Sequence, residues 1–109
     1  MAALYKRYTE LSIVLNRVER GKIIMVSRKV TIKNEEGLHM RPAGIVTREM
    51  TKFHSTVHFI FGDNKINAKS VMNLIAGGIK CGSEITIECD GSDENEALER
   101  AVTLIEKEL

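Results

Sequence analysis

One histidine of this chain lies where a helix is expected to begin. His39 follows Gly37 and precedes Met40-Arg41-Pro42, and proline is favoured in the first turn of a helix, where its missing N–H costs nothing. Because proline disfavours helical angles in the residue before it, the helix is expected to begin at Met40 or at Pro42. In both cases His39 lies beside backbone N–H groups without intrahelical partners, at the positive end of the helix dipole.

This position suits a phosphate group. Free N–H groups at a helix N-terminus bind anions, an imidazole can act as a nucleophile, and the guanidinium of Arg41 can bind two phosphate oxygens. A lone histidine in a capping loop also occurs by chance, so the neighbouring residues must show whether His39 is functional. The sequence has no glycine-rich phosphate loop and no cluster of metal-binding carboxylates. A phosphoryl group on His39 is therefore expected to come from another protein, with no metal or cofactor.

Size and composition predict one small cytoplasmic domain. The chain has 109 residues, enough for a hydrophobic core. Residues 1–24 carry five basic and two acidic side chains, whereas residues 25–109 carry eleven and thirteen. The slight acidic excess and the scarcity of aromatic residues argue against nucleic acid as a direct partner. The longest apolar run, residues 23–26, is too short to cross a membrane, and Cys81 and Cys89 are expected to be reduced thiols.

Residues 1–24 leave two interpretations open. Apolar residues at helical spacing predict a basic amphipathic helix able to lie on a membrane surface; they are Leu4, Tyr8, Leu11, Leu15 and Val18. We favour the alternative that this segment precedes the native start or is foreign to the native chain. The residues Glu19-Arg20-Gly21-Lys22 are compatible with codons of a ribosome-binding site just before Met25. On this interpretation the domain comprises residues 25–109, and the native mass is smaller than that of the full sequence.

Hydrophobic periodicity from residue 26 onward predicts the order β-α-β-β-α-β-α. Alternating residues indicate strands at 26–33, 56–61, 66–68 and 84–89, with a turn at 62–65. Helical spacing indicates helices at 42–52, from Ser70 to the glycines at 77–78, and after residue 93. Asp93 and Glu96 have the spacing of a capping box for the last helix. The pattern predicts an α+β domain with three helices on one face of a sheet.

Two sequence blocks resemble the HPr family, the phosphocarriers of the bacterial sugar phosphotransferase system. Residues 34–43, Asn-Glu-Glu-Gly-Leu-His-Met-Arg-Pro-Ala, resemble its phosphohistidine motif. Residues 67–75, Asn-Ala-Lys-Ser-Val-Met-Asn-Leu-Ile, resemble its regulatory-serine segment and lie at the family's spacing from the first block. The resemblance extends from about residue 25 to residue 109. It implies an open-faced β-sandwich with a four-stranded antiparallel sheet and three helices.

The resemblance also implies roles for the residues around His39. His39 would accept a phosphoryl group on Nδ1 from enzyme I and pass it to sugar-specific IIA domains. Arg41 would neutralise charge on that group, and the backbone amides of Met40 and Arg41 would hold it in place. We expect a monomer that binds these partners transiently.

A docking patch is implied for the surface beside the histidine. Apolar residues on helices are usually core residues, but the resemblance places Val71, Met72 and Ile75 on an exposed patch beside Arg41 and Arg48. Adaptable apolar residues with a basic rim suit binding to several partners. The sequence departs from the family's pattern at two positions, and both bear on partner preference. Family members usually have a smaller residue at the position of Met40, and often methionine at the position of Ile75.

Ser70 is expected to cap the helix that follows it, as serine commonly does. A phosphate there would add negative charge at a helix N-terminus, where it is tolerated, while repelling an acidic partner. The resemblance implies modification by the HPr kinase/phosphorylase of many Gram-positive bacteria. The modified form would slow sugar phosphotransfer and act as co-repressor of a catabolite-control regulator.

Three other functions remain open. A purely regulatory protein acting through Ser70 is one, although relatives of this kind lack the histidine. A nitrogen-branch carrier is another, although such carriers typically match the serine segment less well. The third is a small RNA-binding module. The other two histidines, His54 and His58, are expected to be surface residues without a metal.

Overall fold

The computed structural model describes the backbone of residues 14–19 and 22–109 and the side chains from residue 25 onward. Its elements, in chain order, are β1 (Val14–Glu19), β2 (Lys22–Thr31), α2 (Met40–Met50), β3 (Thr56–Phe61), β4 (Asn64–Asn67), α3 (Val71–Ala76), β5 (Glu84–Asp90), α4 (Glu94–Thr103) and the π-helical turn η1 (Leu104–Glu108). From β2 onward this is the predicted order of strands and helices. The prediction of an α+β fold is confirmed.

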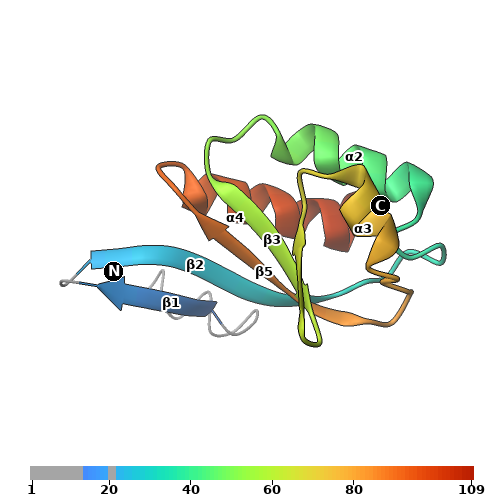
Figure 1. Ribbon diagram of the computed structural model, residues 1–109, viewed down its shortest axis with the longest axis horizontal. Coiled ribbons are helices and arrows are strands. Elements are labelled where there is room, and N and C mark those ends of the chain that lie inside the picture. Colours follow the sequence, from blue (N-terminus) through green and yellow to red (C-terminus); the bar gives the residue numbers. More distant parts are fainter. Residues whose placement is uncertain (1–13, 20–21) are drawn as a thin grey trace.

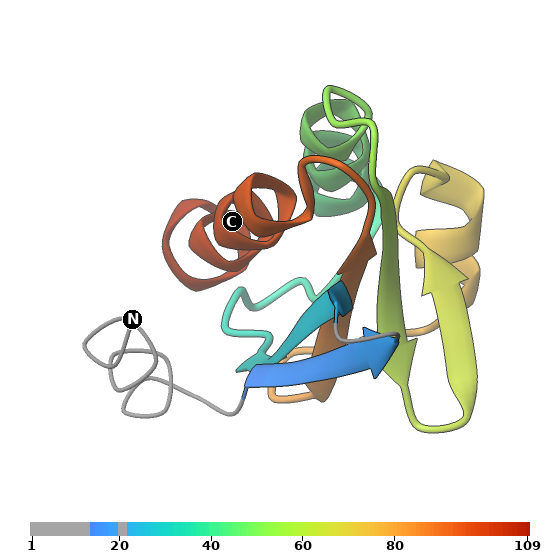
Figure 2. The same ribbon diagram turned by 90° about the vertical axis from the view of Figure 1, so that its left-hand side faces the viewer.

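The strands form one antiparallel sheet in the order β1-β2-β5-β3-β4. Figures 1 and 2 show α2 and α4 packed together over one face of this sheet, while α3 lies beside the outer strand β4. The four predicted strands are β2, β5, β3 and β4, so the open-faced sandwich is also confirmed. β4 begins at residue 64, two residues earlier than predicted, because the turn occupies only residues 62 and 63.

A fifth strand, β1, was not predicted. It pairs antiparallel with β2, and the register shifts between Arg17 and Val18. The helical interpretation is therefore wrong for Leu15 and Val18, whereas Leu4, Tyr8 and Leu11 lie outside the described residues. β2 begins at residue 22, three residues before the predicted domain start.

The hydrophobic core lies between the sheet and the helices. Alternate residues of β3 and β5, such as Phe59 and Ile87, are fully buried, as the period of two predicts. α2 contributes Ala43, Val46 and Met50, which share one face at helical spacing. The inward positions predicted for the last helix are buried as well; they are Ala97, Leu98, Ala101, Leu104 and Ile105. This core fixes the direction of α2, whose N-terminus follows His39.

The start of α4 differs from the predicted capping box. Asp93 is the N-cap residue, but its carboxylate makes no capping bond. It accepts hydrogen bonds from the N–H of His54 (2.9 Å), the N–H of Ser55 (2.9 Å) and the buried hydroxyl of Ser55 (2.5 Å). These bonds lower the pKa of Asp93 to about 2. The capping box is wrong because the carboxylate is used to join α4 to the start of β3.

Candidate functional site

His39 immediately precedes α2, which begins at Met40. Its backbone is extended (φ −88°, ψ −164°), its side chain makes no capping bond, and its imidazole side chain lies on the exposed surface. The first helical hydrogen bond runs from the N–H of Ala43 to the carbonyl of His39 at 2.8 Å. The earlier amides, those of Met40 and Arg41, belong to the first turn and have no intrahelical acceptor. The expected anion-binding end of a helix is thus placed beside an exposed imidazole.

The segment before His39 is held by a loop that is distant in the sequence. Leu38 is buried, and its N–H donates to the carbonyl of Ile79 at 2.9 Å. Gly37 has a positive φ of 65°, and a Cβ there would lie 2.5 Å from the same carbonyl and 2.8 Å from Cα of Lys80. Glycine is therefore required by both backbone conformation and space. Asn34 closes the turn, because its side-chain amide donates to the carbonyl of Gly37 at 2.6 Å.

Arg41 and Arg48 supply positive charge near the start and the end of α2. Both side chains are exposed. Neither takes part in an ion pair within the part of the chain that the structure describes. Their guanidinium groups are thus accessible to a phosphate or to a partner's carboxylates. By contrast, Arg100 of α4 is engaged by Glu49 (3.0 Å) and Glu108 (2.6 Å).

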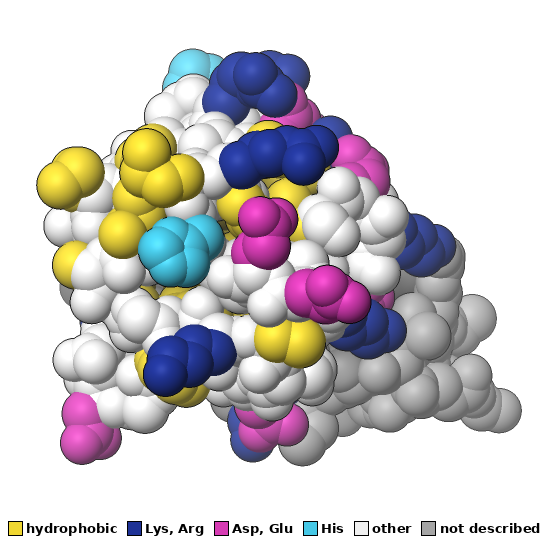
Figure 3. Space-filling view, turned by 90° about the vertical axis from the view of Figure 1, so that its right-hand side faces the viewer, with side chains coloured by type: hydrophobic (Ala, Val, Ile, Leu, Met, Phe, Trp, Pro, Cys, Tyr) yellow, Lys and Arg dark blue, Asp and Glu magenta, His cyan; other side chains and the backbone are white. Residues whose placement is uncertain are grey.

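The predicted docking patch is only partly exposed. From residue 25 onward, where side chains are described, Met40 and Met72 are the exposed large hydrophobic residues, at 71% and 75% of their surface. Val71 and Ile75 are half-buried and pack against the core, so the prediction that they are exposed is correct only for part of each side chain. Figure 3 shows the face where α2 begins and α3 lies: hydrophobic side chains gather next to a histidine and near basic side chains.

Ser70 is the N-cap residue of α3, as predicted. Its hydroxyl oxygen accepts a hydrogen bond from the N–H of Asn73 at 3.3 Å, and the residue is half-buried. The segment that leads into this helix is tied to α2, because the hydroxyl of Thr47 donates to the carbonyl of Ala68 at 3.2 Å. Ser70 and His39 therefore lie at the starts of neighbouring helices.

The remaining titratable candidates do not form a site. His54 is exposed, whereas His58 is half-buried; burial, followed by the charge of Lys65, lowers the pKa of His58. Among the described residues, no group of three His, Cys, Asp or Glu side chains could hold a metal ion. Both cysteines are free thiols: Cys81 is exposed, and burial raises the pKa of Cys89 to about 12. No described helix is long and apolar enough to cross a membrane.

Sequence reasoning missed the residues that support the site from a distance. The backbones of Ile79 and Lys80 pack against Gly37, and the hydroxyl of Ser55 donates a hydrogen bond to Asp93. Their only signal was indirect: Gly37 and Gly91 both stand where a Cβ would overlap a distant backbone. A glycine can be located in a sequence, but the segment that packs against it cannot.

The fold and the site together define a class: a small open-faced α+β sandwich with an exposed histidine at the N-terminus of a helix. Residues 26–107 match the family described as "PTS HPr component phosphorylation site". The HPr-like protein Crh of Halalkalibacterium halodurans is 40% identical over 84 residues, 77% of this chain and 100% of that protein. The phosphocarrier protein HPr of Mycoplasma capricolum is 40% identical over 75 residues, 69% of this chain and 84% of that protein.

Solved structures agree with this relationship. The phosphocarrier protein HPr of Bacillus anthracis has a TM-score of 0.73 at 35% identity, covering 75% of this chain and 98% of that one. Crh of Bacillus subtilis, described as a dimer with a swapped domain, has a TM-score of 0.63 at 31% identity, covering 89% of this chain and 98% of that one. The chain belongs to the HPr family of the phosphotransferase system.

Proposed function

We propose that this chain is a cytoplasmic phosphocarrier that accepts a phosphoryl group on His39 from phosphorylated enzyme I and passes it to sugar-specific IIA domains. The observation that carries the proposal is His39 itself, an exposed imidazole directly before the first turn of α2 in a member of the HPr family. We assign the function to residues 25–109 acting as a monomer.

The reaction transfers a phosphoryl group from one nucleophile, that of the donor protein, to another, the imidazole of His39. The lone pair of Nδ1 of His39 attacks phosphorus, the bond between phosphorus and the donor breaks, and the electron pair of that bond leaves with the donor. The first-turn amides of Met40 and Arg41 and the guanidinium of Arg41 stabilise negative charge on the transferred group. Transfer to the IIA domain repeats the exchange, with His39 as the leaving group.

Docking is proposed to use the exposed surface between α2 and α3. Met40 and Met72 offer adaptable apolar contacts, the exposed parts of Val71 and Ile75 add to them, and Arg48 provides a basic rim. A carrier has to release each partner after transfer, and a small surface of this kind suits short-lived complexes. The partner surfaces are expected to be apolar with an acidic rim.

Regulation is proposed to act through Ser70. HPr kinase/phosphorylase would phosphorylate its hydroxyl, and the product would serve as co-repressor of a catabolite-control regulator. Ser70 adjoins Val71 and Met72 of the docking surface, so a phosphate there would place negative charge against an acidic partner. The helix itself would tolerate this charge, because it lies at an N-terminus.

A purely regulatory protein is the second candidate. It is favoured by the identity of 40% to an HPr-like protein Crh, equal to the identity to an HPr. The presence of His39 favours the carrier, because relatives specialised for regulation lack this residue.

The two functions separate in one labelling experiment. The wild type, His39→Ala and the control His54→Ala are incubated with phosphoenolpyruvate and enzyme I, and the bound phosphate is measured by mass and acid lability. Acid-labile phosphate on the wild type and on His54→Ala, but not on His39→Ala, is the expected result. If a competent enzyme I labels none of the three proteins while the serine kinase labels Ser70, the carrier function is wrong and the regulatory one holds.

A further inference from the structure

The methionine side chains of this chain differ sharply in exposure. Met50 of α2 is fully buried in the core, and Met25 of β2 is half-buried. Methionine is commonly a buried residue, yet Met40 and Met72 are 71% and 75% exposed, and no other large hydrophobic side chain described from residue 25 onward is exposed. Small reagents in solution can therefore reach these two side chains, whereas they cannot reach Met50 in the folded protein.

Both exposed methionines lie beside a residue of the proposed phosphorylation chemistry. Met40 directly follows His39 and is the first residue of α2, whereas Met72 is the second residue of α3, which Ser70 caps. Figure 3 shows hydrophobic side chains gathered next to a histidine on the face where α2 begins and α3 lies. A chemical change in either methionine is therefore a change in the proposed docking surface.

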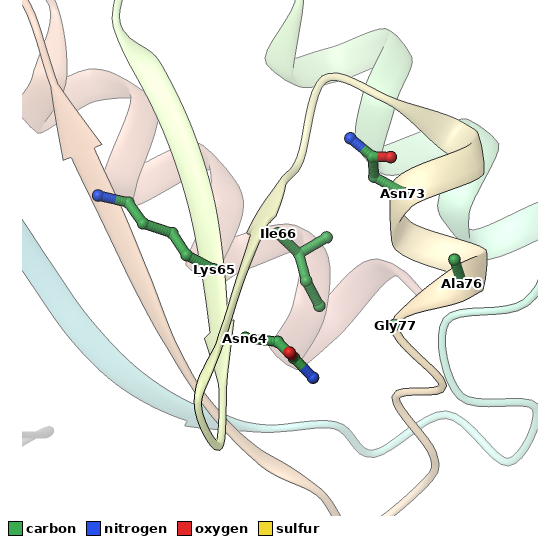
Figure 4. Close-up of a pocket in the computed structure, with 6 residues that line it drawn as sticks. All are labelled: Asn64, Lys65, Ile66, Asn73, Ala76 and Gly77. Carbon is green, nitrogen blue, oxygen red and sulfur yellow. The ribbon is translucent and has the colours of Figure 1, made fainter.

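The helices that carry these side chains are held in place by other residues. α2 is anchored by its buried face, and α3 by Leu74, which is fully buried. The end of α3 packs directly on β4, since a Cβ at Gly77 would overlap Cδ1 of Ile66, and Figure 4 shows the Ile66 side chain extending from β4 towards α3. Neither Met40 nor Met72 belongs to the core. A modification of these two side chains therefore alters the surface and leaves the packing of the helices unchanged.

We propose that Met40 and Met72 are sites of reversible oxidation to methionine sulfoxide by hydrogen peroxide, and that this modification weakens the docking of enzyme I and of IIA domains. The inference rests on the proposed function, because it assigns a further control to the same docking surface. A lone pair of the Sδ atom attacks one peroxide oxygen, the O–O bond breaks and an S–O bond forms. The sulfur is oxidised by two electrons, and the leaving hydroxide takes up the proton of the transferred oxygen as water.

Oxidation replaces an apolar contact of the docking surface by a polar one. A sulfoxide oxygen accepts hydrogen bonds and donates none, so burying it in an interface without a donor is unfavourable. The partners are expected to have an acidic rim, because Arg41 and Arg48 form no ion pair among the described residues. Ionised carboxylates are acceptors only and supply no donor to a sulfoxide. Oxidation of either methionine therefore disfavours the docked state.

The test is oxidation of the full chain by hydrogen peroxide, followed by labelling with enzyme I. All proteins carry Cys81→Ser, because Cys81 is an exposed thiol that peroxide also oxidises. The double variant Met40→Leu, Met72→Leu has apolar side chains that peroxide does not oxidise, and Met25→Leu, which leaves both exposed methionines in place, is the matched control. Each protein is compared with its own unoxidised form. Peptide mapping by mass locates the sulfoxides, initial rates give KM for this chain as substrate of enzyme I, and circular dichroism reports on the fold.

We expect sulfoxide at Met40 and Met72 well before Met50, with an unchanged fold. The KM should rise about tenfold or more with little change in kcat, as for the loss of an important interface contact. Treatment with the two methionine sulfoxide reductases, one for each sulfoxide epimer, should restore the KM. The double variant should keep its own KM after peroxide treatment, whereas Met25→Leu should respond as its parent does.

Three results would overturn the proposal: oxidation of Met50 as fast as that of Met40, an unchanged KM when Met40 and Met72 are both oxidised, or an equal loss in the double variant. A loss of labelling that is accompanied by unfolding would also overturn it. The unoxidised protein tests the proposed function separately. No labelling by enzyme I before oxidation would contradict the carrier function and this inference with it, while labelling that is indifferent to oxidation would contradict this inference alone.

Discussion

Leu38 donates its backbone N–H to the carbonyl oxygen of Ile79, and the two atoms lie 2.9 Å apart. This bond ties the residue before His39 to the loop that leads into β5. Leu38 and Ile79 are both buried, while the imidazole of His39 is exposed. The site is thus fixed from inside the molecule and left accessible outside, which suits a group that reacts with several proteins.

Replacement of Gly37 should damage this arrangement more than replacement of a comparable glycine. Gly37 and Gly62 have nearly equal positive φ values, 65° and 62°, but a Cβ meets Ile79 and Lys80 only at Gly37. Gly62→Ala is expected to cost about 1–2 kcal/mol for the left-handed conformation. Gly37→Ala should cost about 1–3 kcal/mol more, because the backbone of the loop has to move.

Chemical denaturation of both variants measures this difference, and labelling by enzyme I reports its effect on the site. We expect Gly37→Ala to be labelled more slowly than Gly62→Ala at equal fractions of folded protein. Equal stability of the two variants would show that the contact with Ile79 contributes nothing.

Asp93 should make the free energy of unfolding depend on pH in the acidic range. The hydrogen bond from the Ser55 hydroxyl, followed by that from the N–H of His54, lowers the pKa of Asp93 from 3.8 to about 2. The unfolded chain therefore binds this proton more readily than the folded one. The stability that the carboxylate contributes is fully present above about pH 4 and is lost as the pH falls towards 2.

Asp93→Asn removes this titration, so it should lower stability at pH 7 and flatten the decline between pH 4 and pH 2. The control is Asp63→Asn in the exposed turn between β3 and β4, which should keep the wild-type pH profile. Urea denaturation at a series of pH values makes the measurement. A wild-type profile in Asp93→Asn would contradict the role of the carboxylate at Ser55.

Two substitutions of Ser70 should have opposite effects on stability and on function. Ser70→Ala removes the bond to the N–H of Asn73 and should cost about 1 kcal/mol while leaving phosphotransfer intact. Ser70→Asp retains a capping side chain and adds negative charge. It should keep most of the stability and slow phosphotransfer. Thermal unfolding and initial rates of labelling check the pair, and an Asp variant as fast as the wild type would remove the electrostatic account of regulation.

Met72 should matter for partners and not for the fold. Its side chain is 75% exposed, so Met72→Asp should change the free energy of unfolding by no more than about 0.5 kcal/mol. On the proposed docking surface it should weaken binding to enzyme I by about tenfold, or ~1.4 kcal/mol. Calorimetric titration makes the measurement, with Asn95→Asp on α4 as the control. Unchanged affinity would place the docking surface elsewhere.

Local sequence signals predicted the local parts of this molecule. The glycine and proline around His39 placed it before a helix, and Ser70 was correctly assigned as a cap. Long-range contacts were not predictable in the same way. The carboxylate of Asp93 bonds to His54 and Ser55 instead of capping its own helix, because three donors of these two residues, just before β3, are in reach. Val71 and Ile75 are half-buried because α3 packs against the core, which the sequence of the helix alone does not specify.

β1 shows a different limit of sequence reasoning. Residues 14–19 contain apolar residues that fit a helical spacing, yet they pair with β2. In a short segment, apolar residues can fit both the helical period of about 3.6 residues and the strand period of two. Whether such a segment becomes a helix or a strand then depends on whether a strand edge is available for pairing. That edge belongs to β2 and is known only once the sheet is formed.

The most direct test of the carrier function is onward transfer from the isolated phosphorylated protein. The chain is labelled on His39, separated from enzyme I and phosphoenolpyruvate, and mixed with a sugar-specific IIA domain. We predict that label disappears from His39 and appears on the IIA domain, and that Ser70→Asp slows this transfer. Label that stays on His39 in the presence of a competent IIA domain, or that is found only on Ser70, would contradict the account.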